Sequence, residues 1–126
     1  MRLALVTLVI GDYDEAIAYY CDVLGFTLKD NSTVTPEKRW VVVSPGEDGA
    51  DLLLAKAASN EQRAAIGNQT GGRVAMFLNT ANFDETYQRL KQAGVEFIEA
   101  PRDEPYGRVV VFRDLYGNKW DLIQPV

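Results

Sequence analysis

Residues 112–123 read Phe-Arg-Asp-Leu-Tyr-Gly-Asn-Lys-Trp-Asp-Leu-Ile. Residues 114–118 within this stretch are typical of a turn, because Asp hydrogen-bonds its own backbone while Gly and Asn tolerate positive φ. The apolar run after the turn has the composition of a strand. Asp121 interrupts that run, and a carboxylate there costs free energy unless it is solvated, paired or bound to something. The interpretation of the sequence therefore depends on what Asp121 faces.

The composition indicates one globular domain. The chain has 126 residues, 47% of them hydrophobic and 25% charged, which is enough for a core without disulfides. The net charge of −5 disfavours nucleic acid as a partner. Cys21 is the single cysteine, so no internal disulfide can form, and a reducing cytoplasm is the expected location. No apolar run approaches the roughly 18 residues that a membrane helix needs, so no membrane association is expected.

Outward from the turn, the chain shows two segments with the same expected order of elements: strand, helix, strand, strand, strand. The first is predicted to have strands at 3–10, 26–29, 39–44 and 51–55 and a helix at 13–24. The second is predicted to have strands at 73–78, 95–99 and 107–113, the strand after the turn, and a helix at 83–93. Polar loops are expected at 30–38 and 101–105. The order predicts one domain, 1–126, made of a module at 1–57, a connector at 58–70 and a module at 71–126.

The helix starts repeat as well. Asp12 and Asn82 are each good N-cap residues, and each has a Glu three residues later, where a capping-box partner belongs. The predicted fold class is therefore α+β, with two β-α-β-β-β modules that each curl a mixed or antiparallel sheet around one helix.

The modules, with residues 11–20 (Gly-Asp-Tyr-Asp-Glu-Ala-Ile-Ala-Tyr-Tyr) and the closing stretch 114–123, resemble the vicinal oxygen chelate superfamily. That superfamily includes glyoxalase I, bleomycin- and fosfomycin-resistance proteins and extradiol dioxygenases. The resemblance covers nearly the whole chain and implies a cupped sheet. It also implies pairing of modules within a chain or between the chains of a homodimer.

Members of this superfamily often bind a divalent metal in the cup, with His from the first strand and Glu from the last strand of each module. The matching positions here are Leu5, Leu53, Arg73 and Asp121. Leu offers no lone pair and Arg stays protonated, so only Asp121 could bind a cation. The chain contains no His, whereas Zn, Ni or Fe sites need three or four N, O or S ligands. We therefore expect no metal and no cofactor, and metal-dependent glyoxalase I activity is disfavoured.

The candidate ligand-binding residues are those expected to line the cup: Leu5, Thr7, Leu53, Arg73, Phe77 and Asp121. Arg73 and Asp121 are expected to meet there, either as an ion pair joining two strands or as an anchor for a polar or anionic ligand. The apolar members are either plain core or the wall of a small-molecule pocket. Strand alternation places Trp120 on the face opposite to Asp121.

The sequence thus predicts a glyoxalase/bleomycin resistance-like protein that binds a small molecule in a metal-free cup, as a cytoplasmic homodimer. One alternative is a metal-dependent lyase, isomerase or dioxygenase of the same superfamily. Another is a domain for protein association. The catalytic residues, if there are any, and the ligand's identity are not specified by the sequence.

Overall fold

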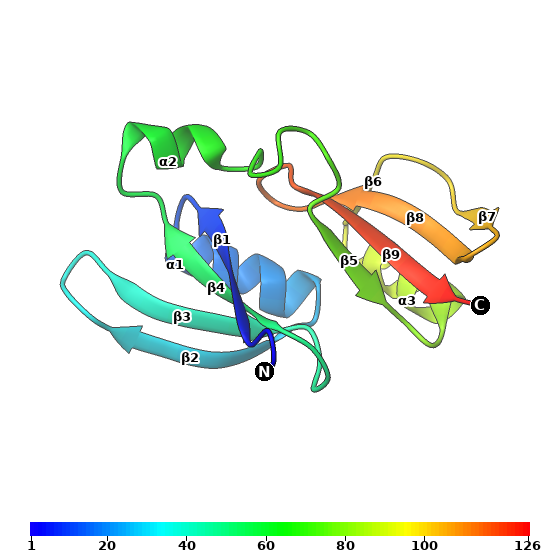
Figure 1. Ribbon diagram of the computed structural model, residues 1–126, viewed down its shortest axis with the longest axis horizontal. Coiled ribbons are helices and arrows are strands. Elements are labelled where there is room, and N and C mark those ends of the chain that lie inside the picture. Colours follow the sequence, from blue (N-terminus) through cyan, green and yellow to red (C-terminus); the bar gives the residue numbers. More distant parts are fainter. The chain divides into compact units, whose positions relative to one another are not determined.

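The computed structural model describes residues 1–126, which form two compact units, Met1–Gly67 and Asn68–Val126. Each unit is a small sheet with a helix lying on one face, as Figure 1 shows for each half of the chain. The architecture is α+β: the first sheet and its helix follow the order β-α-β-β-β, and the second unit repeats this order with one additional short strand, so the predicted fold class is confirmed.

The first unit has a four-stranded sheet in the order β1-β4-β3-β2. Its strands are β1 (Leu5–Ile10), β2 (Thr27–Thr33), β3 (Arg39–Ser44) and β4 (Asp51–Lys56). β1 runs parallel to β4, and the other neighbours are antiparallel. A short helix, α2 (Asn60–Ala65), follows the sheet.

The helix of the first unit begins as α1 (Tyr13–Ile17) and continues as the π-helix η1 (Ala18–Val23). Asp12 caps it, because its carboxylate accepts a hydrogen bond from the backbone N–H of Glu15 at 2.9 Å. The predicted helix at 13–24 is thus present, but its second half is wound more loosely than an α-helix. The wider i→i+5 winding is visible in the bond from the Leu24 N–H to the Tyr19 carbonyl, at 3.0 Å.

The second unit has a five-stranded sheet in the order β5-β9-β8-β6, with β7 also paired to β8. The strands are β5 (Met76–Asn79), β6 (Glu96–Phe97), β7 (Arg102–Glu104), β8 (Gly107–Arg113) and β9 (Lys119–Pro125). The helix is α3 (Phe83–Gln92), capped at Asn82, whose side chain accepts from the Glu85 N–H and donates to the Glu85 carboxylate. The predicted cap is present, but only half of the capping box is formed: the Asn82 backbone N–H donates to the Thr80 hydroxyl at 3.2 Å, and the Glu85 carboxylate accepts from the Asn82 side-chain amide instead.

Two predicted loops were wrong in part. Residues 30–33 belong to β2, and residues 102–104 form β7 beside β8. Both segments are polar because they lie at a sheet edge, where backbone pairing on one side suffices and side chains meet solvent.

The core of each unit lies between its sheet and its helix. In the second unit Trp120 is 1% exposed and stacks on Phe112, with ring centroids 5.9 Å apart. Trp120 therefore faces the helix, as alternation predicted, which places Asp121 on the opposite face. No helix of this chain has the length and apolar character needed to cross a membrane.

Candidate functional site

Asp121 lies in β9 between two neighbours, Phe77 of β5 and Val111 of β8. Residues opposite one another in register present their side chains on the same face of a sheet. Asp121 is only 8% exposed, and its Oδ1 atom accepts no hydrogen bond from the chain. Phe77 beside it is 62% exposed. A buried carboxylate oxygen without a protein partner, next to an open aromatic ring, is the feature that marks this face.

Charged side chains of β7 and of the segment before it form ion pairs around Arg102, and Arg102 and Glu99 are the charged groups that act on Asp121. Arg102 pairs through Nε with Glu99 at 3.2 Å and through a terminal nitrogen with Glu104 at 2.7 Å. Register places Arg102 opposite Val109, which is in turn opposite Ile123, two residues from Asp121. Arg102 therefore lies on the face of Asp121. We call Glu99, Arg102, Glu104 and Asp121 the carboxylate cluster.

Glu99 also completes the sheet. β8 pairs with β6 on one side of Val111 and with β7 on the other, so the partner strand is interrupted there. The Glu99 carboxylate accepts the hydrogen bond of the Val111 N–H at 3.0 Å, while the Val111 carbonyl accepts from the Ile98 N–H at 3.1 Å. A side-chain oxygen thus replaces a missing backbone carbonyl, which fixes the Glu99 carboxylate at the position where it meets Arg102.

The electrostatics of the cluster follow from its geometry. Burial raises the pKa of the Asp121 carboxyl, the Arg102 guanidinium lowers that pKa, and the Glu99 carboxylate raises it again. Hydrogen bonds to Glu104 and Tyr106 raise the pKa of the Arg102 guanidinium, so this group remains charged. The Arg102 guanidinium thus donates to other carboxylates of the chain, and its charge only partly offsets the effect of burial on the pKa of Asp121.

The expected pair between Arg73 and Asp121 is not formed, and that expectation was wrong. Arg73 is exposed and lies in a bend that precedes β5, four residues before Phe77, the residue opposite Asp121. The Asp121 Oδ1 atom accepts no hydrogen bond from any side chain of the protein, that of Arg73 included. The guanidinium near Asp121 belongs to Arg102.

The candidate residues of the first unit share one face of its sheet. Thr7 lies opposite Leu53 in the parallel pair of β1 and β4, and Leu5 is two residues before Thr7 on the same strand. Leu5 and Leu53 are half-buried and Thr7 is exposed. Alternate residues such as Leu8 and Leu54 are fully buried towards the helix, so this face is the open side of the first sheet.

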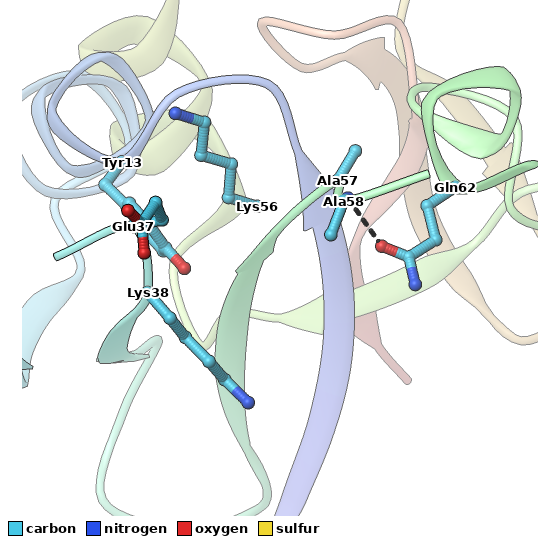
Figure 2. A pocket seen from close by; sticks show the side chains of 7 residues that line it. All are labelled: Tyr13, Glu37, Lys38, Lys56, Ala57, Ala58 and Gln62. Atoms are coloured by element: carbon cyan, nitrogen blue, oxygen red, sulfur yellow. Dashed lines mark hydrogen bonds between the residues drawn. The ribbon is translucent and has the colours of Figure 1, made fainter. Parts of the chain in front are cut away.

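A separate pocket of about 390 Å³ lies in the first unit, at the start of α1 and the end of β4 (Figure 2). It is lined by Tyr13, Glu37, Lys38, Lys56, Ala57, Ala58 and Gln62. Its charged side chains are exposed, and Figure 2 shows the amide oxygen of Gln62 engaged by the Ala58 N–H at 2.7 Å. No buried, unpartnered polar atom points into it, so it offers a ligand no fixed anchor comparable with Asp121.

The residues at the metal-ligand positions do not fit a metal. Leu5, Leu53 and Arg73 supply no donor atom, and Asp121 alone is too few for a transition metal. The structure brings together no group of three His, Cys, Asp or Glu side chains that could hold an ion. Cys21 offers no alternative ligand, because burial and then the Asp22 carboxylate raise the pKa of its thiol, which keeps it protonated.

Sequence reasoning missed Glu99 and Glu104 as site residues and treated Arg102 as part of a loop. One signal was present: Arg102 and Glu104 are two positions apart, the spacing that places side chains on one face of a strand. The contribution of Glu99 depends on the interruption between β6 and β7, which has no signature in the sequence.

The fold and this site define a class: proteins with two repeated modules of the β-α-β-β-β type, an open sheet face and no conventional metal ligands at the matching positions. The family model described as the Glyoxalase/Bleomycin resistance protein/Dioxygenase superfamily matches residues 2–122. The chain belongs to this superfamily, which confirms the resemblance seen in the sequence.

Three proteins are similar to this chain in sequence or in structure. An uncharacterized protein of Shewanella frigidimarina is 51% identical over 94% of this chain and 90% of its own length. The crystal structure of UcmS2 superposes with a TM-score of 0.84 at 33% identity, covering 98% of this chain and 97% of that one. TnmS3, an antibiotic binding protein from Streptomyces sp. CB03234, superposes with a TM-score of 0.81 at 25% identity, covering 100% of this chain and 97% of that one.

Proposed function

We propose that this protein binds a small organic molecule on the sheet face that carries Phe77 and Asp121, and that it does so without a metal. The function is sequestration or carriage of the molecule. Arg73, at the start of the second module, contributes a further contact to a ligand on this unit. Leu5, Thr7 and Leu53 form a corresponding ligand-binding face on the sheet of the first unit.

The observation that carries this proposal is that an exposed aromatic side chain, Phe77, lies beside a buried carboxylate, Asp121, whose Oδ1 atom has no partner. Small-molecule sites combine apolar walls with a few fixed polar groups that set orientation. Phe77 supplies exposed aromatic surface, and the Asp121 Oδ1 atom supplies an acceptor that is buried and unused by the chain. An unpaired buried acceptor costs about 1–3 kcal/mol, which a ligand donor would recover.

The similar proteins support a binding role. TnmS3 is described as an antibiotic binding protein, and the superfamily model is named in part for bleomycin resistance. By analogy the ligand of this chain is an antibiotic-like molecule with aromatic or apolar parts, although a shared fold alone does not determine the ligand. We also propose that the protein acts in the cytoplasm as a homodimer, in keeping with its single free cysteine and with the commonest form of oligomer.

A thermal-shift screen of EDTA-treated protein against bleomycin and a panel of aromatic antibiotics tests the proposal. We expect at least one compound to raise the melting temperature, and isothermal titration of that compound to give saturable binding. Phe77→Ala should weaken this binding by about tenfold, since a truncated aromatic contact costs at least 1.4 kcal/mol when it is a main anchor. Leu115→Ala, at another exposed apolar side chain of the same unit, is the matched control and should bind normally.

Two results would contradict the proposal. One is a compound that binds equally well to wild type and Phe77→Ala but not to Lys56→Ala, which would place the site in the pocket of Figure 2. The other is binding that requires added Zn, Ni, Mn or Fe, which would restore the metal-dependent alternative.

A further inference from the structure

We propose that the ligand carries an organic cation, an ammonium or guanidinium group, and that an N–H of this group donates to the Asp121 Oδ1 atom. The inference rests on the proposed function and specifies the chemistry of the ligand. The ligand expected from Arg73 carried a polar or anionic group, whereas the one proposed here carries a cationic group.

The first argument is the charge of the carboxylate cluster. Its four side chains are three carboxylates, Glu99, Glu104 and Asp121, and one guanidinium, Arg102. With all three carboxylates ionised the cluster is negative by two charges. A cation that approaches this face is attracted, and an anion meets more negative than positive charge.

Arg102 already donates hydrogen bonds to two carboxylates of the chain. Its Nε donates to Glu99 at 3.2 Å and its Nη1 donates to Glu104 at 2.7 Å. An incoming carboxylate would have to compete with Glu99 and Glu104 for the N–H groups of the Arg102 guanidinium. Arg102 therefore serves to bring the carboxylates together and not to capture an anion.

The third argument is independent of the cluster's net charge and concerns Asp121 itself. The residue is only 8% exposed, and its Oδ1 atom has no donor within the chain. Alternation and register point this carboxylate to the face that holds Arg102. Charge-assisted hydrogen bonds from ammonium or guanidinium groups to carboxylates are about twice as strong as neutral ones, so a cation is the donor that fits this oxygen best.

The exposed ring of Phe77 also favours a cationic ligand. Its ring is directly opposite Asp121 in register and is largely exposed. The face of an aromatic ring attracts cations as well as apolar groups. The expected ligand is therefore an amine attached to an aromatic or other apolar body, which covers Phe77 while its nitrogen reaches Asp121.

Three probes of nearly equal shape test this inference: naphthalenemethylamine, naphthalenemethanol and naphthaleneacetate. Each is titrated at neutral pH in the presence of EDTA into isotopically labelled full-length protein, with amide shifts at residues 77, 111 and 121 as the readout. We expect the amine to bind about tenfold or more tightly than the alcohol, and the carboxylate to bind most weakly.

Variants assign the preference to the cluster. Asp121→Asn should reduce the preference for the amine over the alcohol to about twofold or less, because the charge that distinguishes them is gone. Glu104→Gln should reduce it by a smaller factor and serves as the second variant if Asp121→Asn folds poorly. Glu47→Gln, at an exposed turn of the other unit, should leave the preference unchanged.

The outcomes separate the two proposals. The cation inference would be overturned if the amine and the alcohol bound with equal affinity and both shifted the amides around Phe77. It would also be overturned if the carboxylate bound more tightly than the amine. Either result would leave small-molecule binding on this face intact. A preference for the amine that persists in both Asp121→Asn and Glu104→Gln would also overturn it. Absence of shifts at residues 77, 111 and 121 with all three probes, if the antibiotic screen also fails, would overturn both.

Discussion

The indole N–H of Trp120 donates a hydrogen bond to the carboxylate of Asp114 at 2.9 Å, and both residues are buried. The other oxygen of the same carboxylate accepts from the backbone N–H groups of Tyr116 and Asn118, each at 3.0 Å. Asp114 therefore holds the turn closed and anchors the Trp120 side chain on the helix side of the sheet. Because neighbouring residues of a strand face opposite ways, this anchor also orients Asp121 to the open face.

We expect Asp114→Ala to lower the free energy of unfolding by about 3 kcal/mol or more, because it leaves the buried Trp120 N–H without its acceptor and opens the turn. Asp114→Asn should lower it by less, since the amide oxygen keeps part of the acceptor function. Denaturant melts followed by Trp fluorescence measure both values. An Asp114→Ala variant within about 0.5 kcal/mol of wild type, the range of an ordinary surface change, would contradict this account.

Glu99 provides a second test of the local structure. Glu99→Ala leaves the buried Val111 N–H without a partner, and we expect a loss of about 1–3 kcal/mol. Glu99→Gln retains an acceptor oxygen and should cost less. Hydrogen exchange of the Val111 amide should be faster in Glu99→Ala than in Glu99→Gln. Equal exchange in the two variants would show that the side-chain bond does not close the gap between β6 and β7.

The sequence predicted the fold because the local signals are strong and occur twice. The caps at Asp12 and Asn82 repeat, and the turn at 114–118 has the residues that its hydrogen bonds require. Each of these signals acts within a few residues of the chain, which is the range that a sequence pattern can report.

The site was predicted less well, because its geometry depends on register between distant strands. Asp121 was identified correctly as the unusual charge, but its arginine was taken to be Arg73. The actual neighbour, Arg102, reaches this face through two successive pairings, β7 with β8 and β8 with β9. Whether a charged segment such as 102–104 becomes a strand or a loop is decided by the edge it meets, which propensity alone does not specify.

We expect the protein to be a homodimer. The superfamily pairs modules within or between chains, and two-fold dimers are the commonest oligomers. Exposed apolar side chains, such as Leu3 before β1 and Phe77 in β5, are available for such pairing or for a ligand. Sedimentation velocity at micromolar concentrations should give the mass of two chains. A single species with the mass of one chain throughout that range would contradict this expectation.

We expect no stoichiometric binding of a transition metal. The positions that carry ligands in metal-dependent relatives are occupied by side chains that cannot donate, apart from Asp121. Protein incubated with Zn, Ni, Mn or Fe and then desalted should retain far less than one equivalent by elemental analysis. Near-stoichiometric retention in wild type that is lost in Asp121→Ala would show that a site exists with ligands other than those considered.

The final prediction concerns the stability of Asp121→Asn as a function of pH. The folded-state pKa of Asp121 is raised above its unfolded value of about 3.9, chiefly by burial, while Arg102 and Glu99 are the charged groups that face it. Above the folded pKa the buried charge therefore destabilises the protein, and this cost shrinks as the pH falls from the folded pKa to the unfolded pKa, below which it is absent. Asp121→Asn should accordingly be more stable than wild type at neutral pH, because it removes the buried charge, and the advantage should shrink in acid.

The same variant distinguishes the two arginines. In a double-mutant cycle, Arg102→Gln should couple to Asp121→Asn, because loss of the guanidinium raises the pKa of Asp121 further and enlarges the gain from Asn. Arg73→Gln should show a coupling below about 0.5 kcal/mol, as expected for residues that do not meet. If Asp121→Asn instead lost about 3–5 kcal/mol at neutral pH and coupled to Arg73, Asp121 would be a member of a buried ion pair. Its oxygen would then not be free to receive a ligand.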